Sequence, residues 1–157
     1  MNIIVKKFNE LTTSELYDVL QLRSEVFVVE QDCVYQDIDG KDQKAHHVIG
    51  LKEGKVVAYT RLFDGGDYFE TPSIGRVVVA LSERKYGYGH DIIKASIKAV
   101  YEHYKNKKIT ISAQTYLLKF YGTHGFVATG EEYLEDGLPH VKMAVSYTHL
   151  TLPTSPK

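Results

Sequence analysis

The stretch that decides the fold is Ser73–Tyr104, with the sequence SIGRVVVALSERKYGYGHDIIKASIKAVYEHY. Its first part, Ile74–Val79, is β-branched and apolar on both faces, which predicts a strand buried inside a sheet. From Ile92 to Tyr104 the apolar residues recur at helical spacing, which predicts a long helix. Between these parts, Arg84-Lys85-Tyr86-Gly87-Tyr88-Gly89 places two glycines at the helix entrance. The stretch is therefore expected to fold as a strand, a glycine loop and a helix.

The glycine loop is suited to binding a phosphate or a pyrophosphate. The first N–H groups of a helix have no partner within the helix, and the macrodipole adds about half a positive charge there. A dinucleotide fingerprint would need glycine at position 92, where the chain has Ile92. A P-loop would need Lys and then Ser or Thr after Gly89, which is followed by His90. The glycine loop therefore matches neither of these nucleotide-binding motifs, although it is still predicted to bind a phosphate group.

Composition and charge narrow the class of protein. The 157 residues are 43% hydrophobic with a net charge of −1, which predicts one globular domain with a full core. The balanced charge argues against nucleic acid or an anionic membrane as the main partner. No stretch approaches the ~18 apolar residues of a membrane span, and the N-terminus lacks a signal layout, so we expect a cytoplasmic protein. Cys33 is the single cysteine, which excludes an internal disulfide.

Hydrophobic periodicity predicts six more strands and two more helices. The strands are expected at residues 3–8, 46–52, 55–63, 109–113, 126–134 and 140–145. A capping box at Thr12 and Glu15 predicts an N-terminal helix, and a short helix is expected from Tyr116 to His124. The resulting order of βα, ββ, βαβα and ββ indicates an α/β domain with a mixed sheet and helices on both faces.

Two segments fall outside this pattern. Residues 30–42 are irregular and acidic, and we expect them to form the wall of a site. From Ser146 the composition changes to Thr, Ser and Pro. The domain is therefore expected to cover residues 1–145, and residues 146–157 to be an appendage that is disordered or not native to the domain.

Two motifs resemble those of the GCN5-related N-acetyltransferases, the GNAT superfamily. Arg84–Gly89 is similar to the signature R/Q-x-x-G-x-G/A, and Phe120–Phe126 is similar to the pattern F/L-Y-x-x-x-G-F that follows the fifth strand of that family. Within the family, two signatures of the ElaA-like branch are similar to segments of this chain: the first is Arg23–Gln31 with Cys33 and Tyr35–Gly40, and the second is Tyr133–His140. The resemblance covers residues 1 to about 145. It implies the GNAT fold, with a mixed, mostly antiparallel sheet of about seven strands.

The resemblance also implies a reaction and a cosubstrate. The chain would transfer an acetyl group from acetyl-coenzyme A to an amine, by direct attack in a ternary complex. The backbone of the fourth strand would face pantetheine and the thioester carbonyl, and the glycine loop would face the pyrophosphate. The implied cofactor-binding residues are Val77, Val78, Val79, Arg84, Lys85, Tyr86, Gly87, Tyr88, Gly89, His90, Gln114, Thr115 and Phe120.

Candidate catalytic residues follow from the same chemistry. Tyr121 is the candidate general acid, because an uncharged phenol can donate its proton to a leaving thiolate. Glu30 is the first candidate general base and His140 the second. The carboxylates of Glu30, Asp37, Asp39 and Asp42 would favour a cationic amine as the acceptor, either a small molecule or a peptide.

Other interpretations of the sequence carry less weight. A calcium loop around Asp37–Gly40 lacks its first and last ligands, and His46 and His47 alternate across a strand, so no metal site is expected. Cys33 as an acyl carrier is less favoured than a free thiol. A non-catalytic sensor that binds acetyl-CoA or CoA remains an alternative function. Both a monomer and a homodimer remain open.

Overall fold

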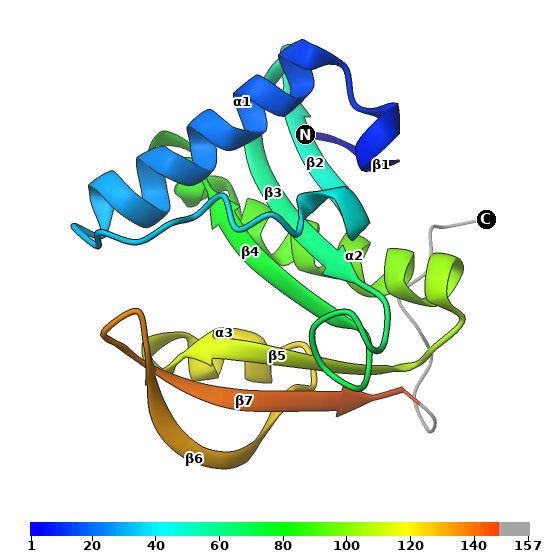
Figure 1. Ribbon diagram of the computed structural model, residues 1–157, viewed down its shortest axis with the longest axis vertical. Helices are drawn as coiled ribbons and strands as arrows, with labels where there is room; N and C mark the ends of the chain where they lie inside the picture. The colour runs from blue at the N-terminus through cyan, green and yellow to red at the C-terminus, as the bar shows by residue number, and fades with distance from the viewer. Residues whose placement is uncertain (148–157) are drawn as a thin grey trace.

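A mixed sheet of seven strands forms the middle layer of the computed structural model, which describes residues 1–147 (Figure 1). The strands are β1 (Asn2–Lys7), β2 (His46–Lys52), β3 (Lys55–Phe63), β4 (Ser73–Val79), β5 (Lys108–Gln114), β6 (Val127–Glu135) and β7 (Leu138–Ser146). Their order across the sheet is β1-β2-β3-β4-β5-β7-β6, and β4 and β5 form its parallel pair. The predicted mixed sheet of about seven strands is confirmed, and so is the predicted order of strands and helices along the chain.

Helices cover both faces of this sheet. They are α1 (Thr13–Arg23), α2 (Tyr88–Tyr104) and α3 (Leu118–Gly122), with the 3-10 turns η1 (Phe8–Glu10), η3 (Asp42–Lys44), η4 (Leu81–Tyr86) and η5 (Thr115–Leu117) and the π-helical turn η2 (Ser24–Glu30). The predicted capping box is present, since the Glu15 N–H donates to Thr12 Oγ1 and the Thr12 N–H donates to Glu15 Oε1. Within residues 1–147, no helix has the length and apolar character needed to cross a membrane.

Neighbouring residues of the central strands point to two separate cores. Ile49 and Tyr59 pack with Val19 and Leu22 of α1 on one face of the sheet. Their neighbours Val48 and Ala58 belong to the cluster built around α2 on the other face, which also contains Ile92, Ile93, Tyr121 and Phe126. This alternation is the period of two that a strand imposes. The sheet is therefore buried on both sides, which fixes β4 and its neighbours as a rigid support.

The sheet is interrupted between β4 and β5. The two strands share a single residue pair, Ser73 with Thr110, and then diverge (Figure 1). On its other edge β4 pairs with β3, but the register shifts between Tyr59 and Arg61. The extra residue of this β-bulge lies near Arg76, whose φ of 49° is unusual for a residue with a side chain. The bulge bends β4 away from β5 and opens the sheet.

One predicted boundary is wrong. The domain does not end at residue 145, because Ser146 pairs with Lys108 in β7 and Tyr147 is 95% buried. The Tyr147 N–H donates to the Lys107 carbonyl oxygen at 3.0 Å, and its hydroxyl donates to the His124 carbonyl oxygen at 2.7 Å. Tyr147 is thus a core residue, while the rest of the predicted appendage, residues 148–157, lies outside the described residues.

Removal of the Tyr147 side chain should destabilise the domain. Tyr147→Ala leaves a cavity in the core around α2 and removes the hydroxyl bond to His124, so we expect the free energy of unfolding to fall by about 3 kcal/mol. Urea denaturation monitored by circular dichroism measures this change. In the control Tyr17→Ala, where the side chain is 70% exposed, the change should stay below about 0.5 kcal/mol. Equal effects of the two substitutions would contradict the assigned role.

Candidate functional site

A groove of about 560 Å³ fills the space where β4 and β5 diverge. Its walls come from the end of β4, the entrance of α2, the η2 turn and the segment from Gln114 to Tyr121. Most of the residues predicted to bind the cofactor line it, namely Val77, Val78, Val79, Arg84, Lys85, Gly87, Gly89, His90, Gln114 and Phe120. Residues far apart in the sequence therefore meet at one site.

The glycines at the entrance of α2 keep this end of the groove open. Gly87 caps the helix with a φ of 73°, a left-handed conformation that favours glycine. A Cβ atom at Gly89 would lie 3.4 Å from the Phe120 ring, so a larger side chain here would enter the groove. The His90 N–H already donates to the Gly87 carbonyl oxygen at 3.1 Å, which corrects the expectation that it faces a phosphate. The N–H groups of Tyr88 and Gly89 remain the expected phosphate donors.

Three predicted cofactor contacts have side chains outside the groove lining. The rings of Tyr86 and Tyr88 contact each other at a tilt, and Lys52 of β2 places its Nζ 4.1 Å from the centre of the Tyr86 ring. Thr115 begins the η5 turn and does not line the groove. For these three residues, contact between their backbone atoms and the cofactor stays a prediction.

An ion pair bridges the groove between Arg84 and Glu30. Both terminal nitrogens of Arg84 donate to the Glu30 carboxylate, at 2.7 and 2.8 Å, and Arg84 Nε donates to the Val79 carbonyl oxygen at 3.1 Å. Arg84, which is predicted to bind phosphate, and Glu30, the first candidate base, are therefore bound to each other. The Glu30 carboxylate is bound by two short hydrogen bonds, and its role as the base stays an untested prediction.

A second, smaller pocket of about 100 Å³ continues from the groove. Both spaces are lined by Phe27, Gln31, Val77, Gln114, Leu117 and Tyr121. Tyr121 therefore lies where the two spaces join. Its ring is buried, and burial raises the pKa of its hydroxyl above the ordinary value for tyrosine, so this hydroxyl keeps its proton at neutral pH.

The far end of the small pocket is built by the β6–β7 hairpin. His140 Nδ1 lies 2.7 Å from the Leu138 carbonyl oxygen, and its Nε2 lies 3.5 Å from Glu135 Oε2. Ser112 of β5 donates to Glu135 Oε1 at 3.1 Å and is also hydrogen-bonded to the Tyr133 hydroxyl. Sequence reasoning found His140 but treated Glu135 and Asp136 only as part of a turn. The signal that could have found Glu135 and Asp136 is their position next to His140 in a segment that resembles a family signature.

Comparison with known proteins identifies the family. The model of the acetyltransferase (GNAT) domain matches residues 10–147. The chain belongs to the GNAT acetyltransferase family. It is 41% identical to the ElaA protein of Escherichia coli K12 over 138 residues, which cover 87% of this chain and 90% of ElaA. The predicted resemblance to the ElaA-like branch is confirmed.

Solved structures agree with this family assignment. A crystal structure of an acyl-CoA N-acyltransferase from Pseudomonas aeruginosa superimposes with a TM-score of 0.87 at 40% identity, covering 93% of this chain and 100% of that chain. The crystal structure of E. coli ElaA gives a TM-score of 0.86 at 37% identity, with the same coverage. The predicted GNAT fold is therefore confirmed across the described domain.

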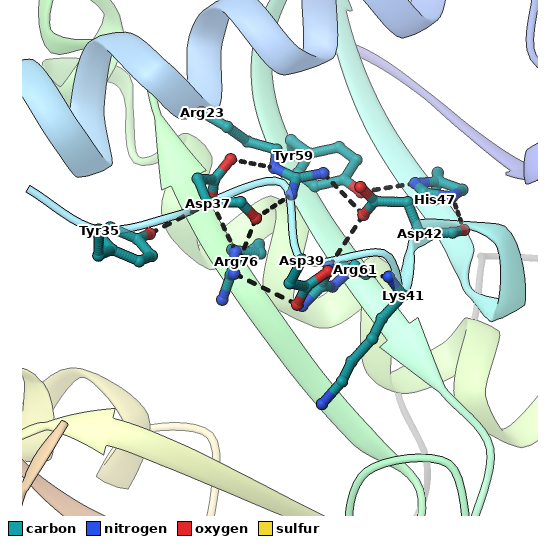
Figure 2. Close-up of polar contacts among 10 residues, drawn as sticks. All are labelled: Arg23, Tyr35, Asp37, Asp39, Lys41, Asp42, His47, Tyr59, Arg61 and Arg76. Carbon is teal, nitrogen blue, oxygen red and sulfur yellow. Dashed lines mark hydrogen bonds and ion pairs between the residues drawn. The ribbon is translucent and has the colours of Figure 1, made fainter. Parts of the chain in front are cut away.

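In this GNAT domain, residues 31–44 are fastened to the sheet by ion pairs (Figure 2). The network joins three arginines to three aspartates, namely Arg23, Arg61, Arg76, Asp37, Asp39 and Asp42. Arg23, fully buried at the end of α1, donates to Asp37 Oδ2 at 2.9 Å and to Asp42 Oδ1 at 2.8 Å. Because the positive and negative side chains are equal in number, the network carries no net charge.

The same network corrects the interpretation of residues 30–42 as an open acidic wall. Arg61 of β3 binds both Asp39 and Asp42, and Arg76 of β4 approaches Asp37 Oδ1 at 2.7 Å. Asp37 and Asp42 are also buried. These carboxylates hold the segment in place and are not free to attract a cationic acceptor.

The other residues considered from sequence have structural partners. His46 Nδ1 lies 2.7 Å from the Tyr104 hydroxyl, and His47 contacts the Tyr59 hydroxyl at 2.6 Å and the Asp42 carbonyl oxygen at 3.0 Å. Cys33 lines the small pocket, where its thiol donates to the Asp136 carbonyl oxygen at 3.3 Å. Among the described residues, no group of three or more His, Cys, Asp or Glu side chains could hold a metal ion.

The ion pairs of Asp39 should make the stability depend on acid pH. Burial acts to raise the pKa of the Asp39 carboxyl, but hydrogen bonds from Arg61 and from the Lys41 N–H lower it to about 2. An unfolded aspartate titrates near pH ~3.9, so the stabilisation is full above about pH 4 and is lost as the pH falls toward about 2. We therefore expect the free energy of unfolding to fall between about pH 4.5 and about pH 2.5, and to fall less in Asp39→Asn.

Urea titrations at both pH values measure this difference. The control Asp67→Asn removes an exposed carboxylate from the loop before β4, and its pH dependence should match that of the wild type. If Asp39→Asn lost as much stability in acid as the wild type does, the ion pairs of Asp39 would not be the cause.

Proposed function

We propose that this protein is an N-acetyltransferase that moves the acetyl group of acetyl-CoA to an amine within a ternary complex. The observation that carries the proposal is that Tyr121 lines both the groove and the small pocket. A cosubstrate in the groove and an amine in the pocket would meet at this residue. The membership of the GNAT family and the likeness to an acyl-CoA N-acyltransferase support the same reaction.

The groove has features that suit acetyl-CoA. The entrance of α2 offers N–H groups at its positive end for the pyrophosphate, with Lys85 nearby. The β4 backbone from Val77 to Val79 lacks β5 as a partner and can bond the amides of pantetheine. The bound cosubstrate would supply an activated acetyl thioester. A β4 N–H directed at the carbonyl oxygen of this thioester would lower the activation free energy by about 3 kcal/mol.

Two side chains would move protons in the reaction. The amine nitrogen forms a bond to the acetyl carbon while the bond from this carbon to sulfur breaks. His140 takes the proton that the amine loses, and Tyr121, kept protonated by burial, gives its proton to the sulfur. Return of a proton from His140 to Tyr121 through water restores both residues. We assign the base role to His140 because Glu30 is paired with Arg84.

Cosubstrate binding can be tested at the glycine loop. In Gly89→Val the new side chain approaches Phe120 and enters the groove, so we expect the Kd for acetyl-CoA, measured by calorimetry, to rise at least tenfold. The control Gly130→Val lies on β6, where an added Cβ atom meets nothing within 4 Å. Its Kd should stay within twofold of the wild type. No binding heat in the wild type would refute the proposed cosubstrate.

Catalysis separates the enzyme from the alternative, a sensor that binds acetyl-CoA without reacting. A free-thiol assay with acetyl-CoA and a panel of amines should show release that depends on one class of amine. In Tyr121→Phe we expect turnover to fall at least tenfold, because the acid is lost, while the Kd for acetyl-CoA stays within twofold. The control Tyr17→Phe, at an exposed tyrosine of α1 that does not line the groove, should keep full turnover. Unchanged turnover in Tyr121→Phe would remove its role as the acid.

A further inference from the structure

The small pocket has a net negative charge that comes from the β6–β7 hairpin. Glu135 and Asp136 line it, and within residues 1–147 neither carboxylate forms an ion pair with Lys or Arg. The arginine that lines the same pocket, Arg76, is held by Asp37 and Asp39. Its charge belongs to the neutral network of three arginines and three aspartates. The pocket therefore attracts a cation and has no uncommitted positive charge for an anion.

The histidine in this pocket is held in a defined tautomer. A carbonyl oxygen can only accept a hydrogen bond, so the contact of 2.7 Å with Leu138 requires a proton on His140 Nδ1. In the neutral ring Nε2 then carries the lone pair. Nε2 lies 3.5 Å from Glu135 Oε2, which is longer than a direct hydrogen bond. His140 is 93% buried, so this lone pair is a buried acceptor beside a carboxylate.

An ammonium group matches this pair of acceptors. It carries several N–H donors on one nitrogen, so it can donate one to the carboxylate and another to the imidazole nitrogen. Ser112 and Tyr133 act as positioning residues, because Ser112 donates to Glu135 Oε1, and the Tyr133 ring stacks on His140 with 6.2 Å between centroids. The carboxylate and the imidazole are thus both fixed before a ligand arrives.

We infer that Glu135 binds the acceptor as an ammonium ion and that His140 Nε2 takes the first proton from this ammonium and passes it to water, so that the same nitrogen can take the second proton when the amine attacks the acetyl carbon. The inference rests on the proposed acetyltransferase function and specifies its substrate. The acceptor is a primary alkylamine that carries no carboxylate, because the pocket repels a carboxylate through Glu135 and Asp136. Sequence reasoning reached a cationic acceptor through the carboxylates of Glu30, Asp37, Asp39 and Asp42, whereas the structure assigns this preference to different carboxylates.

A matched pair of probes tests the substrate class. Ornithine is 1,4-diaminobutane with an added carboxylate, so the two compounds differ in the group that the pocket should reject. With the wild type, we expect kcat/KM for 1,4-diaminobutane to exceed that for ornithine at least tenfold in the free-thiol assay. In Glu135→Gln, KM for the diamine should rise at least tenfold, and the preference over ornithine should fall below threefold. The Kd for acetyl-CoA should stay within twofold.

Control variants separate this effect from a general loss of charge or of folding. Glu132→Gln removes the same charge from an exposed position on β6 outside the small pocket, and its kinetics should match the wild type. Asp136→Asn removes the second pocket charge without touching Ser112 or His140, so it tests the inference if Glu135→Gln does not fold. We expect it to raise KM for the diamine about threefold.

Direct binding distinguishes failure of this inference from failure of the proposed function. Calorimetric titration of 1,4-diaminobutane into the CoA-loaded protein needs no turnover. Diamine binding that weakens at least tenfold in Glu135→Gln supports the inference, even if no thiol is released. The absence of thiol release would refute only the proposed transferase activity. The inference is overturned if the loaded wild type does not bind the diamine, if Glu135→Gln binds it unchanged, or if the wild type prefers ornithine.

Discussion

β4 and β5 run parallel, share one residue pair at Ser73 and Thr110, and then separate, so much of the β4 backbone has no strand partner on that side. The separation depends on the bulge at Arg76, whose left-handed backbone costs about 1–2 kcal/mol for a residue with a side chain. Ion pairs from Arg76 to Asp37 and Asp39 offset this cost. The buried charge network therefore supports the opening in the sheet as well as the loop that closes over it.

The gap between β4 and β5 contains two connected spaces, the groove and the small pocket, which differ in chemistry. The groove beside α2 is largely apolar, with a helix N-terminus at one end, and the pocket beside β6 and β7 is small and polar. Tyr121 borders both, and its burial in the core around α2 keeps its hydroxyl protonated. The rigidity of a sheet covered on both faces fixes the relative position of these spaces. The arrangement suits a direct reaction between two bound molecules.

The sequence predicted those features whose signals are local. The apolar run of β4, the glycines before α2 and the capping box at Thr12 each depend on residues within a few positions of one another. Contacts between distant residues could not be predicted in this way. Glu30 and Arg84 are 54 positions apart, and the acidic segment showed no sign that its carboxylates meet arginines from α1, β3 and β4.

Two further features were missed for separate physical reasons. Ser112 of β5 approaches Glu135 at the end of β6 because β7, the hairpin partner of β6, pairs with β5, and the chain order alone does not specify this pairing. Tyr147 was assigned to the appendage because the composition changes around it, yet one residue of the right size in the right register is enough to fill a space beside His124. Composition averages over a segment, whereas packing acts on single side chains.

The pairing of Arg84 with Glu30 affects how the groove discriminates among anions. A ligand that reaches Arg84 must displace a carboxylate already bound through two short hydrogen bonds, so the exchange releases only the difference between the two interactions. A singly charged metabolite gains little from this exchange. A diphosphate, which can occupy the guanidinium and the helix entrance together, gains more. If the groove binds acetyl-CoA as proposed, the bridge would therefore favour its diphosphate over small, singly charged acids.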